Sequence, residues 1–300
     1  RYHGRRDARG AGAAFIRKQL RMLFTIAWKN IWRSKTRSAI ILSAIALGIL
    51  GGLLSAAVSY GMVEQMVHSA ISTHLAHVQV HSPRYVERKE IAHSLPHPDS
   101  VVSVARSLDA AAAVSKRMTL QAMAATPKTA AGVTLYGIDP ASERRVTTIA
   151  GHTVSGSWFE DDARNPAVIG EKLADKLDAK VGSKIVCTFA DTAGNLTGAA
   201  FRVSGIFSVA AAAIEESHLY VRDTDLQRIA ATDGRYHEVA ILLQSSDDVP
   251  QAVEMLRTHF PGLRVRPWTK LSPELEYINE VFDSMLYVFL LVIVAALAFG

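Results

Sequence analysis

The chain contains only one cysteine, which excludes a disulfide within it. Cys187 lies in the apolar run Lys184-Ile-Val-Cys-Thr-Phe189, which predicts a buried strand with the cysteine as a small core side chain. A reactive thiol would need a base beside it, and the sequence indicates none. We therefore expect Cys187 to be structural.

Acidic residues are almost absent from the first 37 residues, where Asp7 stands against eleven lysines and arginines. The net charge of this segment is +10, whereas the rest of the chain carries −5. All charge is then absent from Ser38 to Val63, a run of 26 residues. Such a run exceeds the ~20 residues that a transmembrane helix needs, and the positive-inside rule places its basic end in the cytoplasm. The basic excess therefore predicts contact with anionic lipid headgroups and not with nucleic acid.

A second uncharged run, Ser284–Gly300, lies at the other end of the chain. Its 17 residues would reach about 25 Å as a helix, short of the ~30 Å hydrocarbon core. Because the chain stops inside this run and starts at Arg1 without a methionine, we expect it to be part of a longer membrane protein. A signal peptide cleaved near Ser55 is disfavoured, since the first run is longer than an h-region and 37 residues precede it.

Together these runs predict a membrane protein with a transmembrane helix, a large extracytoplasmic domain and a second transmembrane helix truncated at the C-terminus. The strand and helix patterns of the domain, given below, predict that its fold class is α+β. The predicted segments are a basic cytoplasmic tail with an interfacial helix (1–37), transmembrane helix 1 (38–63), the extracytoplasmic α+β domain (64–282) and the start of transmembrane helix 2 (283–300). Apolar residues at helical spacing continue past Met62, so we expect helical stalks at both ends of the domain, over 62–76 and 273–283.

The segment before the first span has the profile of a helix that lies in the membrane interface, with aromatic residues on one face and basic residues on the other. The residues that we expect to make this contact are Trp28, Trp32, Arg33, Lys35 and Arg37. An ordinary cytoplasmic helix packed on a partner is the alternative. Within the span, small residues recur every fourth position, which favours close packing of transmembrane helices; they are Ala44, Gly48, Gly52 and Ala56.

The extracytoplasmic domain shows alternating strand and helix patterns. Strands are predicted at His77–His81, Lys116–Ala124, Gly132–Ile138, Val168–Gly170, Lys184–Phe189, Phe201–Phe207, Glu238–Leu243 and Leu263–Val265. Helices are predicted at Val101–Leu108, Glu171–Leu177, Thr224–Ala231 and Pro250–His259, and from Pro273 into the second span.

No motif for nucleotide hydrolysis or metal binding stands out. Gly132 and Gly137 have the spacing of a phosphate-binding loop, but Ile138-Asp139 replaces the Lys-Ser/Thr pair that would hold phosphate and magnesium. His77 and His81 share one face of a strand, with His74 and His68 nearby. Their spacing is a weak zinc signal without a cysteine or a placed carboxylate, so we expect surface or packing roles. No cofactor is indicated.

Two acidic clusters invite a catalytic interpretation. Glu160, Asp161 and Asp162 follow two aromatic residues, and adjacent loop carboxylates of this kind more often make a solvated turn than an acid–base pair. Glu215 and Glu216 stand near His218, but they follow the small apolar run 209–214, which indicates an exposed loop. We therefore expect no catalytic residue and no enzymatic activity in this chain.

Several strings resemble the bacterial FtsX-like permease family, which includes lipoprotein-releasing and macrolide-export (MacB-like) permeases. They are Ala27-Trp-Lys-Asn-Ile-Trp-Arg33, His77-Val-Gln-Val-His81, Gly170-Glu-Lys-Leu-Ala174, Val181-Gly-Ser-Lys184 and Phe201-Arg-Val-Ser-Gly-Ile-Phe207. The resemblance covers roughly residues 20–300 and is nearest to the lipoprotein-releasing permeases.

The resemblance implies the permease subunit of an ABC transporter in the bacterial inner membrane. Its expected partners are a cytoplasmic ABC ATPase, a second permease subunit in a homo- or heterodimer, membrane lipids and a periplasmic carrier or adaptor. The alternative from the residues alone is a membrane-anchored sensor whose external domain binds a ligand. An anchored enzyme is a third reading, and no catalytic constellation supports it.

Overall fold

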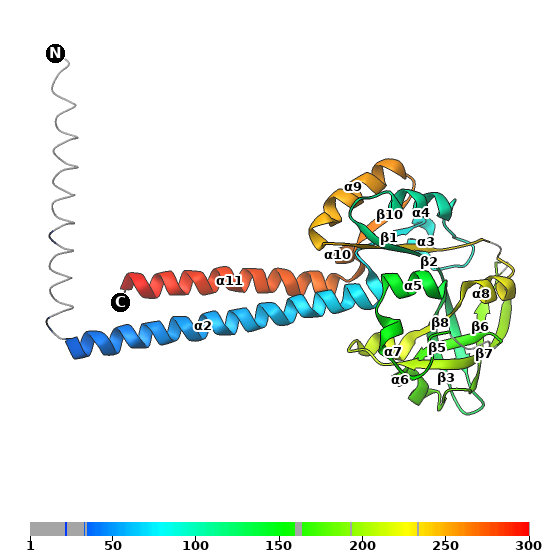
Figure 1. The fold of residues 1–300 in the computed structure, drawn as a ribbon, viewed down its shortest axis with the longest axis horizontal. Coiled ribbons are helices and arrows are strands. Elements are labelled where there is room, and N and C mark those ends of the chain that lie inside the picture. The colour runs from blue at the N-terminus through cyan, green and yellow to red at the C-terminus, as the bar shows by residue number, and fades with distance from the viewer. Residues whose placement is uncertain are drawn as a thin grey trace, which may run out of the picture. The chain divides into compact units, whose positions relative to one another are not determined.

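Two long helices flank the folded domain along the chain (Figure 1). The computed structural model describes residues 22, 33, 35–159, 164–192, 194–232 and 234–299. Helix α2 (Lys35–Ala70) is one unbroken helix of 36 residues, and α11 (Pro273–Phe299) is one of 27. The chain divides into two compact units, Arg1–Met62 with Val281–Gly300, and Val63–Glu280.

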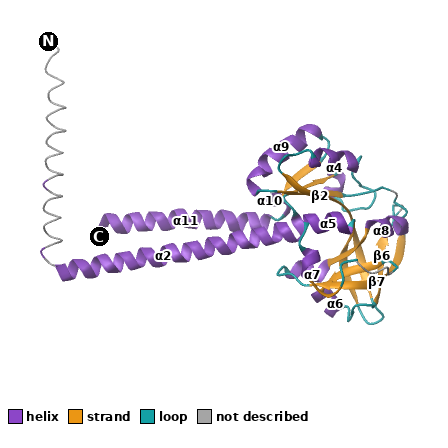
Figure 2. Ribbon diagram, viewed as in Figure 1, coloured by secondary structure: helices purple, strands orange, loops and turns teal. Residues whose placement is uncertain are grey.

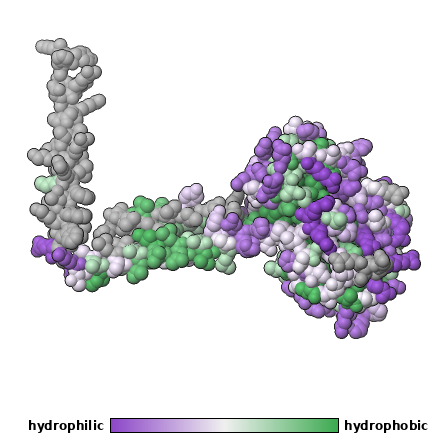
Figure 3. Space-filling view, viewed as in Figure 1, coloured by the Kyte–Doolittle hydropathy of each residue, from purple (hydrophilic) through white to green (hydrophobic). Residues whose placement is uncertain are grey.

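The first unit consists of the apolar parts of α2 and α11. Large apolar side chains of α2, among them Leu47, Leu54 and Val58, are mostly exposed, and Figure 3 shows hydrophobic surface along this helix. Among the described residues, one segment is long and apolar enough to cross a membrane by length and composition, Ala46–Leu75. It overlaps the first predicted span. The second predicted span lies in α11, several of whose side chains are outside the described set, and stays a prediction.

The second unit is built on one ten-stranded sheet that runs β10-β1-β9-β2-β3-β8-β5-β7-β4, with β6 pairing both β2 and β7. Because β6 returns to β2, the path β2-β3-β8-β5-β7-β6 closes into a barrel. The strands are β1 (Val78–His81), β2 (Ala111–Ala125), β3 (Ala130–Ile138), β4 (Thr153–Gly156), β5 (Pro166–Gly170), β6 (Lys184–Ala190), β7 (Leu196–Phe207), β8 (His218–Arg222), β9 (Glu238–Leu243) and β10 (Arg264–Pro267).

Strand β2 joins two lobes of this domain. Its first half, up to Arg117, pairs with β9, and its second half pairs with β3. The sheet lobe, β10-β1-β9 with the first half of β2, carries α4 (Pro98–Arg106) and α9 (Val249–His259) (Figure 2). The barrel lobe contains the other strands with α6 (Glu171–Lys176) and α8 (Asp223–Ala230). Each lobe has its own apolar core, with Val80, Ile241 and Leu256 in the first and Met118, Leu135 and Phe201 in the second.

Seven short helical segments complete the described part of the domain. They are the π-helical turn η1 (Ile71–Leu75), α3 (Pro83–Glu87), α5 (Pro140–Val146), the 3-10 turn η2 (Ile149–His152), α7 (Ala212–Ser217), the 3-10 turn η3 (Ser246–Asp248) and α10 (Trp268–Leu271).

The α+β class and every predicted strand and helix of the domain are confirmed, with shifted ends. Helix α2 also continues past Met62 as the stalk prediction requires, although its last turn, Ile71–Leu75, is π-helical. The interpretation of 209–214 as an exposed loop is wrong in part, because α7 begins at Ala212 and Ile214 is buried. The sequence patterns also missed β4, β8, α3 and α5.

Candidate functional site

Polar side chains line one face of the sheet where its two lobes meet, although that face is largely buried. Along β2, Arg117 and Thr119 alternate with the core residues Met118 and Leu120. Side chains of a strand alternate between faces, so Arg117 and Thr119 lie on the face opposite the core. Arg117 is opposite Glu238 of β9 in the register, and both are buried. Other polar residues on buried positions nearby are Gln79, His81 and His237.

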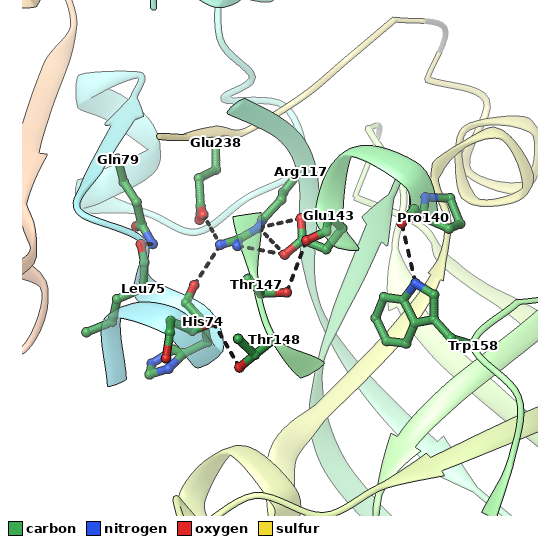
Figure 4. A network of polar contacts seen from close by, with 11 residues as sticks. His74, Leu75, Gln79, Arg117, Pro140, Glu143, Thr147, Thr148, Trp158 and Glu238 are labelled. Carbon is green, nitrogen blue, oxygen red and sulfur yellow. Dashed lines mark hydrogen bonds and ion pairs between the residues drawn. The ribbon is translucent and has the colours of Figure 1, made fainter. Parts of the chain in front are cut away.

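The Arg117 guanidinium holds this junction together (Figure 4). Its Nη2 donates to Glu143 Oε1 of α5 at 2.7 Å, and its Nη1 donates to Glu238 Oε1 at 2.6 Å. Its Nε donates to both Glu143 oxygens at 3.1 Å. Arg117 and Glu143 are 3% and 1% exposed, so this is a buried ion-pair network in which one cation serves two carboxylates.

Electrostatics keep this cation charged. Burial alone would lower the pKa of Arg117, but the negative charges of Glu143 and Glu238 outweigh it and raise that pKa above its usual value. Removing one member of such a buried set leaves an uncompensated charge, which costs far more than an exposed pair does. We call Arg117, Glu143 and Glu238 the polar node.

The polar node is also hydrogen-bonded to the C-terminal end of helix α2. A fifth hydrogen bond of Arg117 runs from Nη1 to the carbonyl oxygen of His74 at 2.9 Å. Ser72 O accepts the backbone N–H of Thr148 at 2.8 Å, and Leu75 O accepts Gln79 Nε2 at 2.9 Å. The last carbonyls of a helix lack partners inside the helix and carry the negative end of its dipole. Here donors from the domain, one of them a cation, occupy them.

The helix end has an unusual backbone. The turn Ile71–Leu75 is π-helical, a form that occurs often at functional sites. Ala76, which follows it, has φ 57° and ψ −178°, a region that residues other than glycine rarely adopt. Ala76 is fully buried, and its N–H donates to Ile71 O at 2.9 Å. The chain therefore passes from helix to strand β1 through a strained residue.

Local sequence explains the position of α5, which supplies Glu143. Asp139 accepts the backbone N–H of Ser142 at 3.1 Å as its N-cap, and Pro140 opens the first turn. The indole of Trp158 donates to Pro140 O at 3.4 Å, so the barrel lobe holds this end of the helix (Figure 4).

Of the histidines considered as a weak zinc signal, His68 is exposed, whereas His77 and His81 are buried and used in packing. His77 Nδ1 accepts the Leu243 N–H at 3.0 Å, and His81 Nε2 lies 3.0 Å from Gln79 Oε1. His237, which was not singled out, accepts the Thr119 N–H at Nδ1 (3.1 Å) and contacts Ile91 O through Nε2 (3.0 Å). Burial lowers the pKa of His237 to about 4. No group of three or more potential metal ligands forms within the part of the chain that the structure describes.

Of the two acidic clusters, the structure describes only the one around Glu215. Glu160, Asp161 and Asp162 lie outside the described residues. Glu215 accepts the Ser208 hydroxyl at 2.8 Å and the Val209 N–H at 2.7 Å, so it closes the loop before α7. His218 contacts Ile214 O and Ser217 Oγ, each at 3.2 Å. The described residues of this region have hydrogen-bond partners that account for their position.

The predicted membrane residues are placed only in part. Trp28 and Trp32 lie outside the described residues, whereas Arg33, Lys35 and Arg37 are exposed, the last two in the first turn of α2. Their contact with a membrane interface stays a prediction.

The predicted packing residues of the span differ among themselves. Gly52 lies against the Phe289 ring of α11, where a Cβ would come within 1.8 Å of the ring, whereas nothing lies within 4 Å of the Cβ position of Gly48. Ala56 lines a cavity of about 260 Å³ beside Gly52 and Phe289. Ala44 is exposed. Packing against a further transmembrane helix stays a prediction for all four residues.

The polar node was not predicted from the sequence. Its signal was the alternation of polar and apolar residues along β2, which usually marks a face open to solvent.

Comparison with known proteins gives a family. The sequence model of the family described as MacB-like periplasmic core domain matches residues 38–259. A search of curated proteins gave no match. Among solved structures, the extracellular domain of the noncanonic ABC-type transporter YknZ from Gram-positive bacteria is 18% identical, with a TM-score of 0.44 over 63% of this chain and 98% of that one. The periplasmic region of MacB from Actinobacillus actinomycetemcomitans is 11% identical, with a TM-score of 0.47 over 70% and 98%.

Proposed function

The chain belongs to the family of MacB/FtsX-like ABC transporter permeases that carry a MacB-like periplasmic core domain, and we propose that it transmits force from a cytoplasmic ATPase to the outside of the membrane. Components of this family work with a cytoplasmic ATPase and have an extracytoplasmic segment on a membrane protein. The family match favours a permease over the membrane-anchored sensor.

We place the protein in the bacterial inner membrane as a multi-pass subunit. The basic tail would be cytoplasmic, 64–282 extracytoplasmic and 283–300 the start of a second span. The charge difference between the first 37 residues and the remainder supports this orientation. A second permease subunit would complete a dimer. The sequence resemblance favours lipoproteins as the substrate, released from the membrane.

The capped end of α2 is the observation on which the mechanism rests. A helix keeps its backbone hydrogen bonds internal, so it stays stiff both in lipid and in water. Helix α2 is unbroken from Lys35 to Ala70 and continues into the π-helical turn η1. The η1 carbonyls of Ser72, His74 and Leu75 accept hydrogen bonds from Thr148, Arg117 and Gln79. Movement of the helix would therefore pass to the lobe junction instead of being lost in a flexible linker.

In this mechanism, ATP binding and hydrolysis in the partner change the distance between two permease subunits. Helix α2 carries that displacement to the polar node, which joins β2, β9 and α5. Because β2 belongs to both lobes, displacement at Arg117 would reach the sheet lobe and the barrel lobe together.

The test interrupts α2 where the span ends. Four residues, Gly-Ser-Gly-Ser, are inserted after Met62, and the matched control receives Glu-Ala-Ala-Lys, which adds about one turn and preserves the helix. Each protein is purified with its partner ATPase, and hydrogen exchange of 71–76 and 111–125 is compared with and without ATP.

We expect nucleotide-dependent exchange in the unmodified protein and in the Glu-Ala-Ala-Lys variant. The Gly-Ser-Gly-Ser variant should bind the ATPase but lose this dependence. A Gly-Ser-Gly-Ser variant that responds to ATP as fully as the unmodified protein would refute the mechanism.

A further inference from the structure

A cavity of about 320 Å³ lies in the extracytoplasmic domain next to the polar node. Its walls come from η1 at the end of α2, from strands β1, β2, β3, β8, β9 and β10, from α3 and the segment after it, and from α10. Ligand sites typically begin at about 300 Å³, so the volume suits a molecule the size of a monosaccharide or an amino acid. Neither the polar node nor the proposed force transmission requires an open space here.

One residue that lines the cavity has a side-chain oxygen without a partner. Within the described residues, Thr119 Oγ1 is buried and has no hydrogen-bond partner. Thr119 is only 6% exposed, and it lines the cavity together with His74. Buried polar groups are satisfied in the great majority of cases, so this oxygen beside a cavity indicates a ligand with a hydroxyl group.

Neutral hydrogen-bonding groups make up much of the remaining interior. Gln79, Gln121 and Tyr136 line the cavity, together with His218. Burial lowers the pKa of His218 to about 4, so its ring is neutral at pH 7. Its Nδ1 contacts Ile214 O and Ser217 Oγ, which leaves Nε2 for a ligand. Such amide, phenol and imidazole groups suit hydroxyls, which both donate and accept.

Two cationic side chains, Lys89 and Arg266, line the cavity. Lys89 is exposed, and Arg266 is half-buried and donates from Nη2 to Lys270 O at 2.5 Å. The carboxylate that lines the cavity, Glu238, is already paired with Arg117 at 2.6 Å. Lys89 and Arg266 therefore leave an excess of positive charge for an anionic group.

We propose that this cavity binds a small hydroxylated monocarboxylate of the size of a hexuronic acid. Its carboxylate lies at Lys89 and Arg266, and its hydroxyls face the unpartnered oxygen of Thr119 and the amides of Gln79 and Gln121. The ligand contacts the end of α2 through His74 and both lobes through β1 and β3. This binding does not depend on the proposed coupling to an ATPase, so it is tested without one.

The test uses the full 300-residue chain in detergent and isothermal titration at low ionic strength. The probes are D-glucuronate, D-glucose as its neutral analogue and D-glucosamine as its cationic analogue. We expect glucuronate to bind, glucose to bind about tenfold more weakly or worse, and glucosamine to bind more weakly still.

Two variants locate the site. Thr119→Val keeps the shape of the side chain and breaks no hydrogen bond, so it should fold normally and lower glucuronate affinity about threefold or more. Lys89→Gln should lower it about fivefold or more and weaken its salt dependence. The control Lys172→Gln changes an exposed lysine on α6 and should bind as the unmodified chain does.

Three results would overturn the proposal. One is the absence of glucuronate binding up to about 10 mM. The second is equal affinity for glucose and glucuronate, which would remove the anionic preference. The third is unchanged affinity in both Thr119→Val and Lys89→Gln, which would place the ligand elsewhere.

Discussion

Replacing Arg117 by methionine tests whether the polar node holds the two lobes together. The substitution keeps much of the side-chain volume but leaves Glu143 and Glu238 charged and without their cation, at 1% and 7% side-chain exposure. Breaking a buried ion pair by removing one partner costs about 3–5 kcal/mol. Here one cation serves two carboxylates and the His74 carbonyl, so we expect a loss near 5 kcal/mol. That is a third or more of the stability of an ordinary domain, which is about 5–15 kcal/mol.

The assay is urea unfolding of the full chain in detergent, followed by tryptophan fluorescence. Trp158 is buried and hydrogen-bonded to α5, the helix that carries Glu143, so its emission reports on this region. Lys116→Met is the matched control one position away. Its ion pair with Asp99 is exposed, and its ammonium lies 4.4 Å from the Tyr236 ring centroid, so the loss should stay at about 1 kcal/mol.

A triple variant separates charge from packing. With Arg117, Glu143 and Glu238 all replaced by methionine, no buried charge remains, and such replacements are often neutral or stabilising. The triple variant should therefore be more stable than Arg117→Met alone by about 2 kcal/mol or more. The reasoning fails if Arg117→Met costs no more than Lys116→Met, or if the triple variant is no more stable than the single one.

Three further predictions concern other parts of the chain. Burial lowers the pKa of His218 and His237 to about 4, below the ~6.5 of the unfolded chain. Between these values the unfolded state binds more protons than the folded state, so the free energy of unfolding should fall as pH drops from about 6.5 to 4, by up to ~1.4 kcal/mol per pH unit for each ring. A urea midpoint that stays constant from pH 7 to pH 4.5 would contradict this. The added methyl group of Gly52→Ala must displace the Phe289 ring, whereas that of Gly48→Ala meets nothing within 4 Å. The unfolding temperature in detergent should therefore fall only for Gly52→Ala. Gly48→Ala should instead gain up to about 1 kcal/mol of helix propensity. Cys187 of β6 is fully buried, and burial raises its thiol pKa to about 12. Maleimide should therefore label it only after unfolding. Labelling of the native chain at the rate of a free thiol would show that β6 is accessible to solvent.

Local patterns predicted most of the domain because strands such as β3, β6 and β7 alternate buried and exposed residues, while β9 is a continuous apolar run. Strand β2 shows where this stops. Its alternation predicts a strand over Lys116–Ala124, but nothing local says that its first half pairs with β9 and its second half with β3 and β6. Strand β8 (His218–Arg222) was missed because it is short and pairs in parallel with β3, about 80 residues earlier in the chain. Such pairing is set by the closure of the barrel.

The polar node could not be predicted for a related reason. Arg117 and Thr119 occupy positions that would face water in a sheet with one open side. The residues that cover Arg117 come from distant parts of the chain. Arg117 bonds to His74, Glu143 and Glu238, which are 43, 26 and 121 residues away in the sequence. A strand arginine alternating with core residues is thus a usable signal only when a helix end or a carboxylate is known to lie above it.

The arrangement at the end of α2 also determines where motion would be absorbed. On the helix side, the terminal carbonyls are bonded to β2, to Gln79 and to the segment before η2, so this end is fixed to the domain. On the strand side, Ala76 holds a backbone conformation that costs about 1–3 kcal/mol and persists because its surroundings are packed. A displacement of α2 that shifts the π-helical turn would act both on the strained backbone of Ala76 and on the hydrogen bond between His74 O and Arg117. In the proposed mechanism, segment 71–77 and the polar node would therefore carry helix movement into the lobe junction together.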